Sequence, residues 1–189
     1  MSKLLLLGPG VSTGRLPHGS QPFGSDPGDQ LTVIDRDRKV LDFWREKAAR
    51  CLHADLRELF GSILLRSLGD EAFDEVHAYE VLNLLTGDAS DFFRLWRFIW
   101  DTLKPGGKVY ASVPHWESQW IHAYPAPQRV YTPGLLGYLY RASSNRVQER
   151  FDSLWPEPYD FKIEEAWTVS DVAGNLQGWH FCLVKGGGV

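Results

Sequence analysis

Cysteine is scarce in this 189-residue chain: Cys51 and Cys182 stand far apart, in no spacing typical of a metal or redox site. This scarcity argues against a disulfide framework and against a zinc site. Long apolar runs are also missing, since none approaches the ~20 residues that a membrane-spanning helix needs. The run from Leu4 to Leu7 stops at Gly8, too early for a secretory signal. We therefore expect a cytoplasmic protein with no membrane segment.

Neither sign of charge is in large excess, because 20 Lys and Arg face 24 Asp and Glu, giving a formal net charge of -4. This balance gives no support to a general binder of nucleic acid or of anionic membranes. Hydrophobic residues are 43% and charged residues 23%, as in an ordinary globular domain, so we treat 1–189 as one domain. Aromatic residues reach 13%, with eight tryptophans, and several stand among polar residues, where they favour a pocket or a partner surface.

The apolar periodicity predicts alternating strands and helices. Strands are expected over 3–7, 31–34, 74–79 and 108–113, with a short strand or turn over 51–56. Helices are expected over 38–52, 59–68, 89–103 and 135–150, and a terminal antiparallel pair over 161–169 and 179–184. Prolines break the Gly/Pro-rich loop 8–30, so the first crossover helix should be missing or shortened. The order predicts an α/β fold: a Rossmann-like, mostly parallel sheet with a C-terminal antiparallel hairpin.

In such sheets the ligand binds outside the carboxyl ends of the strands. This rule places the chemistry at residues that follow predicted strands: 8–10, Asp35, Asp55, 79–82 and 114–116. The aromatic, proline-bearing loop 114–133 lies where it could act as a lid over that edge.

Two segments resemble the class I S-adenosylmethionine-dependent methyltransferases of small-molecule type. The run Phe73–Leu82 matches the family's "FD" strand with its "vL" exit, and Leu103–Lys108 matches its "LKPGG" turn, with one amphipathic helix between them. The resemblance extends from Leu4 to about Lys185. It implies an enzyme that uses S-adenosylmethionine to methylate an unidentified small-molecule or glycan-like acceptor.

The resemblance also assigns cofactor contacts at the strand ends. Asp35, followed by Arg36, stands where an acid accepts hydrogen bonds from ribose hydroxyls, and Asp37 is the better helix cap. Asp55 and Leu56 match an "AD" pair that contacts adenine through the carboxylate and the following backbone N–H, although an Asp there is also a common turn residue. The third main strand ends with two further candidates, Tyr79 and Glu80.

The glycine turn Gly8-Pro9-Gly10 is assigned to the cofactor too, but it departs from the family motif. Leu6 replaces the acid that helps to bind the cofactor's amino group, and Ser12 replaces a third glycine. The missing acid makes Glu80 a candidate for that amino-acid end. These departures motivate an alternative: a methyltransferase-fold binding or assembly module with weak or no cofactor binding. A nicotinamide-dependent oxidoreductase is disfavoured, because the spacing is not Gly-x-Gly-x-x-Gly.

The acceptor side is predicted to involve the loop 114–133. His115 is the candidate general base, ahead of Glu117 and Glu80, and its alternative interpretation is a loop histidine that packs on Trp116. An aromatic wall for a planar, sugar-like or cationic acceptor is predicted from Trp116, Trp120, Tyr124 and Tyr131, with an apolar cluster under the loop as its alternative. We expect a small-molecule partner and no metal, membrane or nucleic acid. An exposed sheet edge leaves a homodimer open.

Overall fold

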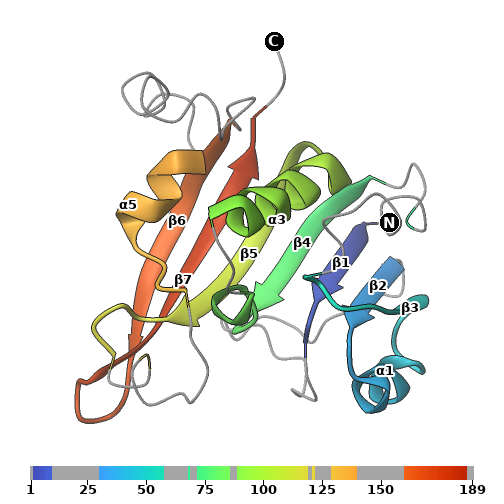
Figure 1. Cartoon of the computed structure of the whole chain (residues 1–189), viewed down its shortest axis with the longest axis horizontal. Helices are drawn as coiled ribbons and strands as arrows, with labels where there is room; N and C mark the ends of the chain where they lie inside the picture. Colours follow the sequence, from blue (N-terminus) through green and yellow to red (C-terminus); the bar gives the residue numbers. More distant parts are fainter. Residues whose placement is uncertain are drawn as a thin grey trace.

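The computed structural model describes residues 2–9, 30–57, 68, 72–85, 89–118, 121, 129–139 and 160–186. Within these ranges one seven-stranded sheet runs in the order β3-β2-β1-β4-β5-β7-β6 (Figure 1). Strands β1 to β5 are parallel, and β7 is antiparallel to both β5 and β6. The predicted α/β class with a C-terminal antiparallel hairpin is confirmed. The strands are β1 Lys3–Leu7, β2 Gln30–Asp35, β3 Arg50–His53, β4 Phe73–Tyr79, β5 Leu103–Pro114, β6 Phe161–Ser170 and β7 Leu176–Lys185.

The two faces of the sheet carry two separate apolar cores. Along β1, Leu5 and Leu7 belong to the larger core, with helix α3 (Ala89–Thr102), which lies across β4 and β5 (Figure 1). Leu4 and Leu6 belong to the smaller core, with helix α1 (Arg38–Trp44). A central parallel strand buried on both faces has to be apolar at every position, and this accounts for the leucine run.

The structure corrects the extent of two predicted helices. The helix predicted over 38–52 ends at Trp44, where a turn begins with a bond from Lys47 N–H to the Trp44 carbonyl (2.9 Å). The last part of the predicted helix, from residue 50, instead begins β3, because the backbone at Cys51 pairs with Val33 of β2. The helix predicted over 135–150 begins at Pro133, capped by Thr132, and gives way to a 3-10 turn after four residues. These two elements are α5 (Pro133–Leu136) and η2 (Gly137–Leu139). A further 3-10 turn, η1, spans Leu82–Leu84 after β4.

Three of the expected features concern residues that the structure does not describe. These are the missing or shortened crossover helix, which depends on 10–29, the helix over 59–68, apart from Leu68, and the continuation of α5 beyond residue 139.

The two motif segments that carry the family resemblance are joined by an ion pair. The Lys104 ammonium of the "LKPGG" turn lies 2.6 Å from the Asp74 carboxylate of the "FD" strand, and Lys3 N–H donates to the same carboxylate (2.8 Å). The Lys104 ammonium beside Asp74 holds the pKa of that carboxyl below its ordinary value. Asp74 thereby links β1, β4 and β5 at their amino ends, opposite the edge where a ligand is expected.

Candidate functional site

Four strand ends meet around Gly8, the residue directly after β1. Its N–H donates to the Ile34 carbonyl at the end of β2 (2.8 Å). Its φ of +54° is a left-handed value that favours glycine. A Cβ placed on Gly8 would lie 2.6 Å from Val81 Cγ2 and 3.6 Å from Leu56 Cδ1, the residues that follow β4 and β3. The structure therefore brings together the segments that the sequence singled out separately.

Asp35 closes β2 as a buried carboxylate, with 7% of its surface exposed. Its Oδ1 accepts the Asp37 N–H (2.8 Å), which turns the chain out of the strand. Asp37 caps α1 by accepting the Lys39 N–H (2.9 Å), so the prediction that Asp37 is the helix cap is confirmed. The Arg36 carbonyl lies 2.9 Å from His53 Nε2 at the end of β3. The Asp35 carboxylate is thus held by a local turn at the edge where a ligand is expected.

Asp55 and Leu56 follow β3 and differ in what they can offer a ligand. The Asp55 carboxylate lies 2.5 Å from Arg57 Nη2 and accepts from Arg57 Nε (3.0 Å), and this partner holds the Asp55 pKa below its ordinary value. A ligand that used Asp55 would share it with Arg57. The Leu56 side chain is 5% exposed and lies in the larger core, which leaves its backbone as the part that can meet a ligand.

Tyr79 ends β4, and its hydroxyl lies 2.9 Å from His77 Nδ1. His77 Nε2 is 2.9 Å from Glu75 Oε2, and the imidazole stacks on Tyr110 with centroids 5.1 Å apart. Burial raises the pKa of the Tyr79 hydroxyl, so Tyr79 remains neutral. His77 is 1% exposed and packs within the sheet as a strand residue. The contacts of His77 with Glu75 and Tyr79, its neighbours on the same face of β4, were not predicted from the sequence.

Glu80 has a backbone conformation that is strained for its residue type. Its φ of +53° is positive, and no other non-glycine in the described part of the chain shares that property. The Glu80 N–H donates to the Ser112 carbonyl (2.9 Å), and its carboxyl accepts a hydrogen bond from the Ser112 side chain. Although the residue is exposed as a whole, the atoms around its carboxyl desolvate it and raise its pKa. The kink turns the chain so that Val81 packs against Gly8.

His115 follows β5 as a buried residue, 3% exposed, and stacks on Trp116 with ring centroids 3.9 Å apart. Its Nδ1 accepts the Glu117 N–H (3.2 Å), so in the neutral ring the proton is assigned to Nε2. The basic lone pair on His115 Nδ1 is therefore occupied by the hydrogen bond from the Glu117 N–H. Trp116 also packs edge-on against Trp179 (5.3 Å), in line with the interpretation of His115 as a packed histidine.

The predicted aromatic wall is described only in part. Trp120 and Tyr124 lie outside the described residues, as does Gly10 of the glycine turn. Tyr131 is 1% exposed and packs in the core against Phe92 (6.0 Å), so it does not face an open cleft.

No family model matches the sequence, and no curated protein matches it either. Solved structures do match. One is the N-methyltransferase NodS from Bradyrhizobium japonicum WM9 in complex with S-adenosyl-L-homocysteine, at 13% identity over 97% of this chain and 78% of that chain, with a TM-score of 0.59. Another is a SAM-dependent methyltransferase from Archaeoglobus fulgidus, at 13% identity over 97% and 86%, with a TM-score of 0.60. The chain has the class I methyltransferase fold.

The methyltransferase fold does not by itself specify the reaction. The [4+2]-cyclase SpnF matches equally well, at 18% identity over 99% of this chain and 75% of that chain, with a TM-score of 0.60, and its name describes a cyclisation. Function must therefore be argued from the site.

One departure from the methyltransferase motif has a clear structural reason. Leu6, which stands where the family has an acid, is 1% exposed and packs in the smaller core between Val33 of β2 and His77 of β4. An acid at this position would be buried among leucines and valines.

Among the described residues, no group of three or more His, Cys, Asp or Glu side chains could hold a metal ion. The described helices include none that is long and apolar enough to cross a membrane.

Proposed function

We propose that this chain binds S-adenosylmethionine at the edge formed by the ends of β1 to β4 and transfers its methyl group to a small-molecule acceptor. The observation that carries this proposal is the meeting of the β1, β2, β3 and β4 ends around Gly8, with the buried Asp35 carboxylate beside them. The cofactor supplies an activated methyl group on a sulfonium, and the protein supplies binding and orientation.

The donor and acceptor groups at this edge suit such a cofactor. Asp35 is an acceptor for the ribose hydroxyls, with Arg36 beside it, and the Gly8-Pro9 turn passes close by. Asp55 and the Leu56 N–H are proposed to meet the adenine. Tyr79 and Glu80 are proposed to meet the amino-acid end, where Glu80 supplies the negative charge that Leu6 does not.

The Glu80 assignment predicts a pH-dependent affinity. Desolvation raises the Glu80 pKa, so this carboxyl protonates at a higher pH than an ordinary glutamate. Only the ionised form attracts a cofactor ammonium, so affinity for S-adenosylhomocysteine should fall as pH is lowered through the raised pKa. In Glu80→Gln the affinity should be weaker by roughly tenfold and should lose that pH dependence. Isothermal titration calorimetry between pH 4.5 and 8 would measure both; a wild-type profile retained in Glu80→Gln would reject the assignment.

His115 and Trp116 are proposed to line the acceptor side, together with Trp120 and Tyr124. An acceptor that must lose a proton needs a base, and His115 Nδ1 can take that proton only after the Glu117 N–H leaves it. Glu80, with its raised pKa, is the other candidate base at this edge.

Methyl transfer is tested with S-adenosylmethionine carrying a tritiated methyl group, incubated with separate pools of amines, hydroxyl compounds and thiols. We expect label in one pool, with the transfer inhibited by S-adenosylhomocysteine. Transfer to no pool, together with weak or absent binding of S-adenosylhomocysteine, would favour the second candidate function, a binding or assembly module, which the buried Leu6 at the position of the family's acid supports.

A further inference from the structure

One face of the sheet changes from apolar to polar between β1 and β4. Leu4 and Leu6 of β1 pair with Glu75 and His77 of β4, so all four residues lie on the same face. The registers extend this face in rows across β4, β5, β7 and β6. The rows are Tyr79, Ser112, His180 and Trp167; then His77, Tyr110, Cys182 and Glu165; then Glu75, Lys108, Val184 and Lys162.

Sheets covered by helices on both faces show nearly continuous apolar runs. On this face, β1 and β2 follow that rule, with leucine and valine packed against α1. The rows across the other four strands are instead mostly polar, charged or aromatic, whereas the opposite face of β4, β5 and β7 is apolar and lies in the larger core. This face of the four strands is therefore suited to contact polar or charged groups and not an apolar helix.

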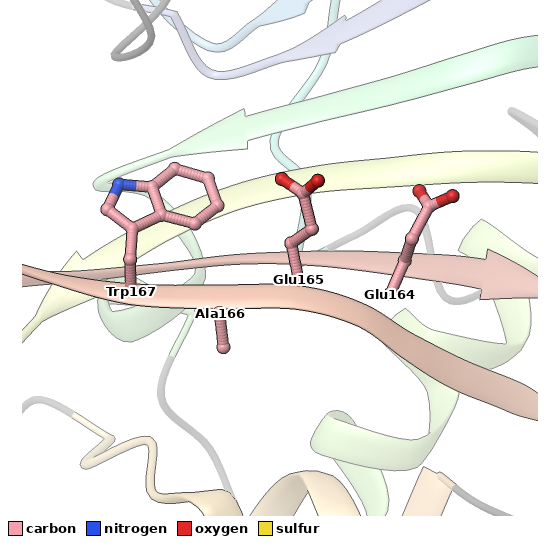
Figure 2. Close-up of a pocket in the computed structure, with 4 residues that line it drawn as sticks. All are labelled: Glu164, Glu165, Ala166 and Trp167. Atoms are coloured by element: carbon pink, nitrogen blue, oxygen red, sulfur yellow. The ribbon is translucent and has the colours of Figure 1, made fainter.

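The open part of this face is at β6, where a β-bulge brings two carboxylates together. Ile163 pairs with Leu183 and Glu165 with Cys182, which leaves Glu164 as an extra residue. Figure 2 shows both carboxylates and the Trp167 indole on one side of the strand, with Ala166 on the other. Glu164 and Glu165 are exposed and Trp167 is half-buried. Together these residues line an open hollow of about 560 Å³, four strands away from β1 and the Gly8 turn.

The two carboxylates in this hollow differ in how far they are neutralised. Glu164 lies 2.7 Å from the Lys108 ammonium and accepts a bond from Cys182 Sγ (3.4 Å). Glu165 forms no hydrogen bond or ion pair with another residue in the described ranges. The next side chain on its side of the strand is Trp167, whose indole is stacked on His180 with centroids 5.4 Å apart and planes 20° apart.

An uncompensated carboxylate next to an indole is a combination that selects for organic cations. The carboxylate attracts positive charge and repels anions, and the indole face adds a cation–π attraction that neutral molecules lack. A bare divalent metal ion needs more oxygen ligands than this hollow offers. Residues two apart on a strand have Cα atoms about 6.6 Å apart, so one organic cation on the open side of the strand can meet both side chains.

We propose that the hollow beside β6 binds an organic cation, an alkylammonium or guanidinium group, which contacts the Glu165 carboxylate and the Trp167 indole. The group is carried by a small molecule or by a basic side chain of another protein. This site is separate from the strand-end edge and does not depend on cofactor binding.

The test follows the indole N–H signals of the full chain by NMR. Each of the eight tryptophans has one indole N–H, and the signal missing in Trp167→Phe belongs to Trp167. Titration with tetramethylammonium or ethylguanidinium should shift this signal saturably, whereas the neutral isostere tert-butanol should not. Equal shifts with tert-butanol, or no shift with either cation, would overturn the proposal. Tighter binding of a capped Gly-Arg-Gly peptide than of ethylguanidinium supports a protein source, and equal binding supports a small molecule.

A matched pair of variants distinguishes the effect of the Glu165 carboxylate on binding from the effect of overall surface charge. Glu165→Gln should weaken tetramethylammonium binding by roughly tenfold. Glu46→Gln removes an exposed acid in the turn after α1 and should leave the affinity unchanged. If Glu165→Gln binds as tightly as the wild type, or if both variants weaken binding equally, the site is not the one proposed.

Discussion

Replacing Gly8 by alanine should destabilise the chain by about 2–4 kcal/mol. A left-handed φ, here +54°, costs an ordinary L-residue about 1–2 kcal/mol. The new Cβ would also lie 2.6 Å from Val81 Cγ2 and 3.3 Å from Val81 Cβ. Val81 is branched at Cβ and sits in the larger core, so it has little freedom to move away. The loss should appear as a lower urea midpoint with an unchanged slope.

Gly174 provides the matched control for this substitution. Its φ is +81°, but a Cβ there would meet nothing within 4 Å. Gly174→Ala should therefore show the backbone cost alone, about 1–2 kcal/mol. In the double variant Gly8→Ala/Val81→Ala, part of the steric clash is removed. Its loss of stability should therefore be smaller than the sum of the losses in the two single variants. Equal losses in the two glycine variants would show that contact with Val81 is not what requires a glycine after β1.

Replacing Asp35 by asparagine should weaken S-adenosylhomocysteine binding by roughly 10- to 100-fold. Asparagine keeps an oxygen that can accept the Asp37 N–H, so the turn after β2 can persist. It loses the negative charge and one of the two acceptor oxygens that would meet the ribose hydroxyls. The effect on affinity should therefore exceed any effect on stability, and calorimetry and thermal unfolding of the same samples would separate the two.

Asp42→Asn is the control for the loss of one acidic charge. Asp42 lies on the exposed side of α1, where it pairs with Arg45 (3.1 Å). This variant should bind S-adenosylhomocysteine as the wild type does. An Asp35→Asn protein that also binds normally would show that Asp35 does not hold the ribose.

The strand positions were predictable because a short apolar run bounded by turn residues is typical of a buried strand. The run Leu4–Leu7 fits a strand buried on both faces, and the terminal hairpin follows from two further runs joined by a turn. The helix predicted over 38–52 was too long because Ala48 and Leu52 continue its apolar spacing. Leu52 instead belongs to β3, and pairing with β2 decides between the two structures.

The strand-end rule located the candidate edge but could not describe its chemistry. The sequence placed Gly8, Asp35 and Glu80 after separate strands, and the parallel sheet brings the chain at those positions to one edge. The positive φ of Glu80, however, and the hydrogen bond from its N–H to the Ser112 carbonyl in β5 could not be read from the residue types. The use of His115 Nδ1 by Glu117 likewise depends on the local turn, which residue types alone do not specify.

The most direct measurement is a calorimetric titration of the full chain with S-adenosylhomocysteine, with NAD as the control ligand. We predict one saturable site with a micromolar dissociation constant for S-adenosylhomocysteine and no binding of NAD. No binding of S-adenosylhomocysteine at millimolar concentration would contradict the proposed cofactor site.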